Sequence, residues 1–184
     1  MTIENPVSGE RIVIRQSAAD TNGELLLWDL FLAAGGRVPS SHAHPEQEER
    51  FTVLAGRMKF RVGWRPVTLG PGETVTVPPG AVHSFANAGN CTAHVLVETR
   101  PALDMERLLV TAAEMARETQ RTARLFPTLP RPHELLLFMR DFEHEVKAPY
   151  VPAFLLRSVV RPLAGLARRA GLDGRYRRWR HADS

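Results

Sequence analysis

GRVPSSHAHPEQEERFTVLAG, residues 36–56, is the stretch that decides the fold of this 184-residue chain. It begins and ends with glycine, and it holds His42 and His44 two positions apart, with Glu49 following. Side chains two apart on an extended segment project from the same face, so both imidazoles can share one metal ion. The stretch therefore predicts a metal site on extended backbone.

Two adjacent glutamates compete for the third ligand position. If Glu48 faced the metal, Arg50 would follow it into the core, because side chains of a strand alternate between its two faces. If Glu49 faces the metal, Phe51 and Val53 follow it instead. The second arrangement buries apolar side chains, so the sequence favours Glu49 as the ligand.

GETVTVPPGAVHSFAN, residues 72–87, supplies the fourth ligand. A short β-rich run precedes a Pro-Pro-Gly turn, and a second run begins at His83. Phe85 shares the face of His83 on this second run, so the imidazole is expected to point inward with the apolar side chains. His83 is the natural partner of the ligands in the first stretch.

The two stretches resemble the paired motifs of the cupin superfamily. The first matches the pattern G-x5-HxH-x4-E-x6-G and the second matches G-x5-PxG-x2-H-x3-N, which ends at Asn87. The resemblance covers roughly residues 20–100 and is typical of small, single-domain cupins. It implies a jelly-roll β-barrel with one divalent transition metal inside (Fe, Mn, Zn, Ni or Cu), held by His42, His44, Glu49 and His83.

Short β-rich runs separated by glycine and proline fill the first half of the chain, which also predicts a barrel. We assign residues 1–100 to this cupin β-barrel domain. The run from Leu25 to Ala33 has apolar residues on both faces, so both faces should be covered, either by a partner subunit or by the second half of the chain. We expect a homodimer for this reason.

Residues 101–184 are predicted to form a helical extension with a basic C-terminal tail. Apolar residues recur at helical spacing from Met105 to Ala116 and again behind Pro132. A third helical stretch, 153–170, is interrupted at Pro162. Its apolar stripe should pack on the outer sheet of the barrel or on a partner chain, whereas the alternative for this basic, amphipathic stretch is contact with an anionic membrane surface. The stripe consists of Phe154, Leu155, Val159, Leu163 and Leu166.

Charge is distributed unevenly between the two halves. Residues 1–99 carry 8 basic and 10 acidic side chains, whereas residues 100–184 carry 16 and 10. The predicted barrel therefore has no basic surface for nucleic acid, and no helix-turn-helix pattern precedes it. Cys91 is the single cysteine, and the first twenty residues contain no apolar signal segment, so we expect a cytoplasmic protein.

A metal held by three imidazoles and one carboxylate keeps open positions for a substrate if it is six-coordinate. We expect a small-molecule ligand, with a cavity walled by Phe51, Met58, Phe60, Val75, Val77 and Phe85. The leading hypothesis is a metal-dependent enzyme, such as a dioxygenase or isomerase, in which Glu49 is also catalytic and moves a proton. The alternative is a non-catalytic, metal-dependent binding or sensor protein.

Overall fold

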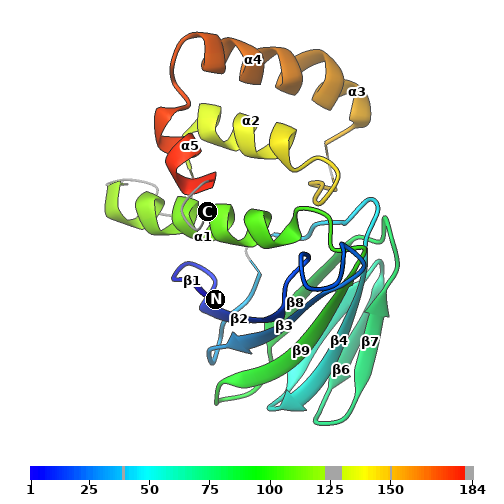
Figure 1. Cartoon of the computed structure of the whole chain (residues 1–184). Helices are drawn as coiled ribbons and strands as arrows, with labels where there is room; N and C mark the ends of the chain where they lie inside the picture. Colours follow the sequence, from blue (N-terminus) through cyan, green and yellow to red (C-terminus); the bar gives the residue numbers. More distant parts are fainter. Residues whose placement is uncertain (39, 123–129, 150, 181–184) are drawn as a thin grey trace.

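The computed structural model describes residues 1–38, 40–122, 130–149 and 151–180. Residues 181–184 of the predicted basic tail lie outside this part. Within the described residues, nine strands come first and all helices follow them (Figure 1). The strands are β1 (Thr2–Asn5), β2 (Glu10–Gln16), β3 (Leu26–Leu32), β4 (Glu48–Ala55), β5 (Met58–Val62), β6 (Arg65–Leu69), β7 (Thr74–Val77), β8 (His83–Asn87) and β9 (Ala93–Arg100).

The strands form two antiparallel sheets around one apolar core. One sheet has the strand order β1-β2-β3-β9-β4-β7, and the other has the order β6-β5-β8. Strands distant in sequence are neighbours, since β9 lies between β3 and β4. This arrangement confirms the predicted jelly-roll barrel followed by helices.

Strand β4 shows the alternation that the sequence predicts. Glu49, Phe51 and Val53 are buried, whereas Glu48 and Arg50 are exposed. The strand ends in a tight turn at Gly56 that leads into the other sheet, where φ is +83° and a Cβ atom would lie 2.8 Å from the Cα of Ala93. Only glycine tolerates both the left-handed backbone and this close approach.

Strand β3 is covered on its outer face by side chains of neighbouring strands. Asp29 is buried there because it accepts a hydrogen bond from Arg15 Nε at 2.6 Å and lies 2.7 Å from His94 Nε2. The ring of Phe31 stacks on His94, with the guanidinium of Arg11 on its other side. Side chains of the barrel itself therefore provide part of the cover predicted for this face. The homodimer stays a prediction.

The helices form layers beyond one end of the barrel (Figure 1). Helix α1 packs on β1, α5 packs on α1, and α4 packs on α2. Buried residues of α1 belong to the same apolar core as the barrel strands, so this helix is attached to the barrel. The helical elements are α1 (Met105–Thr122), α2 (Pro132–Asp141), α3 (Ala153–Leu155), the π-helical turn η1 (Leu156–Val160), α4 (Arg161–Arg169) and α5 (Gly174–Arg180).

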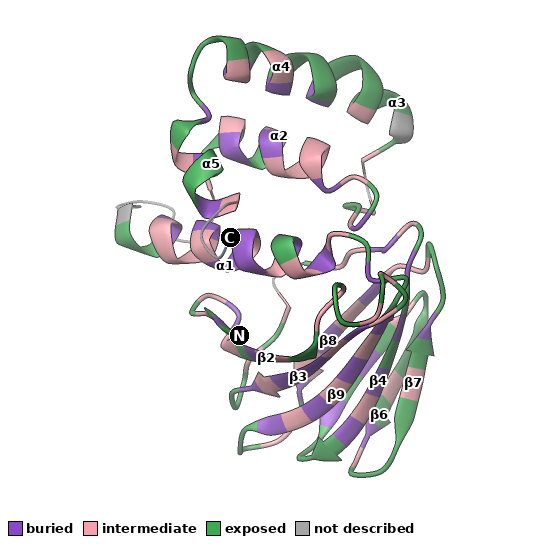
Figure 2. Cartoon of the chain, in the orientation of Figure 1, coloured by how far each residue is buried: buried purple, intermediate pink, exposed green. Residues whose placement is uncertain are grey.

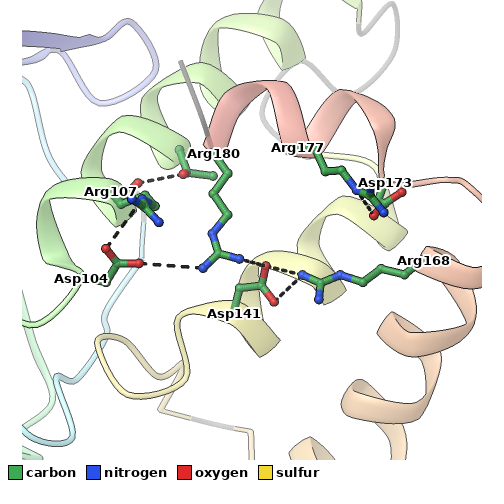
Figure 3. Close-up of polar contacts among 8 residues, drawn as sticks. Asp104, Arg107, Asp141, Arg168, Asp173, Arg177 and Arg180 are labelled. Carbon is green, nitrogen blue, oxygen red and sulfur yellow. Dashed lines mark hydrogen bonds and ion pairs between the residues drawn. The ribbon is translucent and has the colours of Figure 1, made fainter. Parts of the chain in front are cut away.

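Arginine–aspartate contacts tie these layers together (Figure 3). Asp141, at the end of α2, accepts two hydrogen bonds from Arg168 Nη2 at 2.8 and 2.6 Å and one from Arg180 Nη1 at 3.0 Å. Arg180 also lies 3.9 Å from Asp104, just before α1. A single carboxylate therefore connects α2, α4 and α5.

The third helical stretch differs from expectation in the face that it buries. Its small residues Ala164 and Ala167 are buried, whereas Leu163 and Leu166 are 44% and 56% exposed. In Figure 2, the side of α4 that faces away from the barrel is coloured mostly as exposed. The prediction that the apolar stripe packs on the outer sheet of the barrel is therefore wrong. Small side chains let α4 approach α2 closely, and the large ones are left outside.

The expected interruption near Pro162 takes the form of the π-helical turn η1. Proline has no N–H to donate, and its ring would collide with the carbonyl four residues earlier in a regular helix, so the preceding turn widens. Among the described helices, none is long and apolar enough to span a bilayer.

Candidate metal centre

Three histidines meet at the end of the barrel that faces the helices. His42 and His83 form an antiparallel bridge, with backbone hydrogen bonds of 3.0 and 2.8 Å in the two directions. Their ring centroids are 4.3 Å apart, and His44 lies 5.0 Å from His42 and 5.2 Å from His83. One nitrogen of each ring lies within 4.8 Å of the others, so a single ion can contact all three.

Glu49 joins the histidines from strand β4. Its Oε2 atom lies 3.2 Å from Nε2 of His44 and 3.2 Å from Nε2 of His83. The side chain is 5% exposed, and a carboxylate buried this deeply requires positive charge or hydrogen-bond donors beside it. The structure thus brings together the four residues that the sequence predicted as ligands.

Backbone carbonyls orient the three imidazoles. The Nδ1 atom of His42 lies 3.1 Å from the carbonyl of Ser40, and that of His83 lies 3.3 Å from the carbonyl of Ala81. Nδ1 of His44 lies 2.5 Å from the carbonyl of Glu145, in the loop after α2. A carbonyl only accepts, so each Nδ1 carries the proton and each Nε2 keeps its lone pair. This is the tautomer that binds a metal through Nε2.

Two of these Nε2 atoms have no hydrogen-bond partner. Nε2 of His44 and of His83 are buried, and neither makes a hydrogen bond within the described part of the chain. Buried polar atoms without partners are rare in native structures, and a bound ion is one of their ordinary explanations. The donor set therefore fits a divalent transition metal, which imidazole and carboxylate ligands suit.

The pKa values of the candidate ligands are shifted by burial and by one another. Burial alone would raise the pKa of Glu49, but His44 and His83 hold it well below its usual value. Burial opposes charge on His44 as well, yet the Glu49 carboxylate raises its pKa. Burial, and then the two neighbouring imidazoles, lower the pKa of His42 from 6.5 to about 3. His42 thus stays neutral, as a metal ligand must.

The comparisons with known proteins agree with this geometry. The model of the cupin domain family matches residues 29–98, a range that contains all four candidate ligands.

Residues 29–98 form a cupin domain.

Solved cupin-like structures show the same fold. KdgF from Halomonas sp. is 17% identical, with a TM-score of 0.50, and the match covers 56% of this chain and 91% of that chain. A predicted oxalate decarboxylase from Thermotoga maritima is 22% identical, with a TM-score of 0.50, and the match covers 55% and 90%. None of the curated proteins compared with the sequence matches it. At these identities the likeness concerns the fold alone.

A cavity of about 360 Å³ opens from the candidate metal centre of the cupin domain, within the range of small-molecule sites. His42, His44 and Glu49 form part of its wall. Helices α1 and α2 form most of the opposite wall, so the helical extension encloses the site rather than covering the outside of the barrel. The metal centre therefore lies at the junction of the two halves of the chain.

Of the six residues predicted to wall the cavity, the structure places Phe85 on it. Phe51, Met58, Phe60 and Val77 are at most 1% exposed and fill the barrel core, and the partly buried Val75 packs against that core. The rings of Phe51, Phe60 and Phe85 pack against one another, with centroids 5.2 to 6.1 Å apart. Aromatic packing thus closes the barrel below the three histidines and leaves the space above them, next to α1.

Sequence reasoning missed the helical wall of the cavity, the carboxyl group of Glu10 and the carbonyl of Glu145. The apolar face of α1 was visible as a periodic pattern, but the pattern alone does not say what the face contacts. Glu145 acts through its backbone, so the identity of its side chain gives no signal for this contact.

Proposed function

We propose that this chain is a metal-dependent enzyme that acts on a small organic molecule bound in the cavity above the metal. The observation that carries the proposal is the set of three imidazoles and one carboxylate, of which His42, His44 and Glu49 line a cavity of about 360 Å³. Such a set leaves coordination positions for substrate when the ion is six-coordinate. One divalent ion per chain would supply Lewis-acid or redox chemistry there.

Glu49 has a second proposed role. Its Oε2 faces His44 and His83, and its carboxyl group forms part of the cavity wall. In the described part of the cavity wall, Glu49 is the carboxylate nearest the three histidines, so it is the candidate for accepting a proton from a bound substrate. Isomerisation and dioxygenation are the reaction types that this arrangement suits.

Metal analysis and substrate turnover test the proposal together. Reconstituted protein should retain one equivalent of a divalent transition metal, measured by elemental analysis, and should convert one member of a panel of small organic acids and phenols, followed by mass spectrometry. His83→Ala should lose both metal and turnover. Cys91→Ser, at an exposed position away from the site, is the matched control and should keep both. Wild-type protein that retains no metal after reconstitution would contradict the proposal.

A non-catalytic binding or sensor protein is the second candidate. The walls of the cavity beyond the metal are mainly apolar, which suits holding a ligand more than exchanging protons with it. Binding of a panel member in the presence of metal, with the compound recovered unchanged, would favour this candidate.

Assembly as a homodimer is proposed for the outer face of β3. Leu27 and Phe31 are partly exposed there, although β3 lies between β2 and β9 inside the six-stranded sheet. Light scattering should report twice the chain mass at micromolar concentration, and a monomer would remove this proposal.

A further inference from the structure

The cavity extends from the metal along one face of α1. The residues of α1 on its wall recur at helical spacing and therefore share one side of the helix. They are Met105, Leu108, Leu109, Ala112, Met115, Ala116 and Thr119. Between the first and last of them the helix axis rises about 21 Å, at 1.5 Å per residue. A volume of about 360 Å³ along such a length makes the cavity narrow.

The two ends of the cavity lie beside different segments of the chain. At the start of α1, the backbone N–H of Asp104 donates to Glu145 Oε1 at 3.3 Å, and the carbonyl of Glu145 orients the metal ligand His44. Near the end of α1, Gln120 Nε2 donates to the carbonyl of Pro6 at 3.3 Å, in the β1–β2 turn. The metal therefore lies at the N-terminal end of α1, and the β1–β2 turn lies at the other end.

Glu10 marks the far end. This residue lines the cavity, and its carboxyl group accepts a hydrogen bond from Ser8 Oγ at 2.5 Å. Burial raises the pKa of Glu10, which favours a neutral carboxyl group. Between Glu10 and the metal, the helical walls are leucine, methionine, alanine and phenylalanine side chains. A hydrophilic molecule would leave its hydroxyl groups without partners in this middle section.

We propose that the site takes an elongated amphiphile, with a carboxylate or 2-hydroxycarboxylate head on the metal and an unbranched apolar body along α1. The inference rests on the proposed metal centre for the head group. Its new element is the body of the ligand, which the helical extension recognises through apolar contact. The narrow shape favours a single chain over a fused ring system.

A homologous series of straight-chain 2-hydroxy acids, from hydroxybutyrate to hydroxydecanoate, tests the inference by calorimetry on the metal-loaded protein. Each added methylene buried in the cavity should raise the affinity about fourfold. An affinity that does not change with chain length would overturn the inference while leaving the metal centre intact. Protein that holds no metal but still prefers longer acids would instead refute the proposed function and support the apolar channel.

Two variants of α1 make the test specific. Ala112→Phe and Ala116→Phe each place a ring in the middle of the cavity, and they should abolish the gain from longer chains. Ala88→Phe, at an exposed position of the barrel away from this cavity, is the matched control and should keep the gain from longer chains. Metal content should stay the same in all three variants, which shows that the fold and the metal end are intact. An unchanged chain-length dependence in both phenylalanine variants would place the body of the ligand elsewhere.

A second inference comes from the outward face of the third helical stretch. Six large apolar side chains between residues 154 and 172 are exposed by 38% to 65%. Three of them, Leu155, Val159 and Leu163, are four residues apart, and the widened turn η1 keeps this spacing close to one line along the helix. The result is an outward apolar stripe made of Phe154, Leu155, Val159, Leu163 and Leu166, with Leu172 beyond its end.

Charge near the stripe indicates its partner. Residues 151–180 contain eight arginines and one acidic residue, Asp173. Five of the arginines pair with carboxylates of Asp173 and of residues outside this segment. The other three, Arg157, Arg169 and Arg178, are exposed. Two copies of this face would repel each other, whereas anionic lipid head groups would attract it. We infer that the stripe docks on an anionic membrane surface.

Vesicle sedimentation tests this second inference. The full chain should bind vesicles that contain phosphatidylglycerol and should bind phosphatidylcholine vesicles much less. Leu163→Glu together with Leu166→Glu should abolish the binding. Leu54→Glu is the matched control, because Leu54 is 41% exposed on the barrel. Absence of vesicle binding overturns the inference, as does a stripe variant that changes only the oligomeric state in light scattering, which would assign the stripe to a contact between copies.

Discussion

Helices α1 and α4 carry apolar stripes of the same spacing, but the stripe of α1 is buried and the stripe of α4 is exposed. On α1, Met105 and Leu108 are 2% and 7% exposed and lie against the barrel and its cavity. On α4, Leu163 and Leu166 are 44% and 56% exposed. Periodicity therefore shows that a helix has an apolar face, but it does not show what covers that face.

Connection length and side-chain size explain the difference. Helix α1 begins shortly after β9 ends, so the chain holds its apolar face against the open end of the barrel. Helix α4 is separated from the barrel by α2 and packs on α2, and its buried residues are the small Ala164 and Ala167. Small side chains allow close packing of helix backbones, which gives α4 a partner without using its leucines.

Truncation after Arg100 should have the largest effect, because it removes both stripes at once. The barrel would lose the α1 residues that share its core and the wall that encloses the metal cavity. We expect the truncated chain to aggregate, since large contiguous apolar surface favours association. Size-exclusion chromatography measures the outcome. A truncated barrel that stays monodisperse and retains metal would show that the barrel does not need α1.

Single leucine substitutions compare the two stripes directly. Leu108→Ala should lower the free energy of unfolding by about 3 kcal/mol, because a buried leucine is removed from the core. Leu163→Ala should change it by no more than about 0.5 kcal/mol, because the side chain is already exposed. Urea denaturation provides both values. Equal losses in the two variants would mean that α4 is covered in solution.

Metal binding should stabilise the segments that hold the candidate ligands and leave α4 unaffected. With free metal at about 100 times Kd, the folded state gains about 2.7 kcal/mol, which raises Tm by roughly 5–10 °C for a chain of this size. Hydrogen exchange should slow at residues 42–49 and 145–147, which hold His44 in place, and should not change in α4. Chelation of the metal reverses both effects. If hydrogen exchange slowed equally in α4, the helix would not be independent of the metal site.

Asp141→Ala should have the smallest effect of the four. Removal of this carboxylate leaves Arg168 and Arg180 without the partner that connects α4 and α5 to α2. We expect a loss of about 2 kcal/mol, because both arginines are partly exposed and recover some hydration. Arg178→Ala, at an exposed position of α5, is the control and should stay within about 0.5 kcal/mol. Thermal unfolding monitored by circular dichroism compares the two.

The barrel and the grouping of His42, His44, Glu49 and His83 could be predicted from sequence for a physical reason. Each depends on local rules: alternation along a strand, histidines two apart, and a glycine at a turn. Alternation also placed Glu49 inside the barrel and Glu48 outside it. These rules need no knowledge of distant segments.

The cavity could not be predicted because it depends on which distant segments meet. Phe51 and Phe60 are as apolar as the residues that line the cavity, but they pack with Phe85 and fill the space below the three histidines. The largest share of the wall itself comes from α1, which begins at Met105, 45 residues after Phe60. Likewise, the orientation of α4 depends on small residues, whose weak apolar signal is outweighed by the leucines beside them.

The backbone ladder between Ala43 and Lys147 has a consequence for the order of events during synthesis. These residues exchange backbone hydrogen bonds of 3.0 and 2.8 Å. Next to them, the Nδ1 atom of His44 contacts the backbone carbonyl of Glu145. All nine described strands have been translated by residue 100, yet this support emerges from the ribosome only after residue 147. Because chains fold from the N-terminus as they are made, the strands can associate before the ligands are rigid. Secure loading of the metal is therefore expected late in biosynthesis, after the helical half has closed over the barrel.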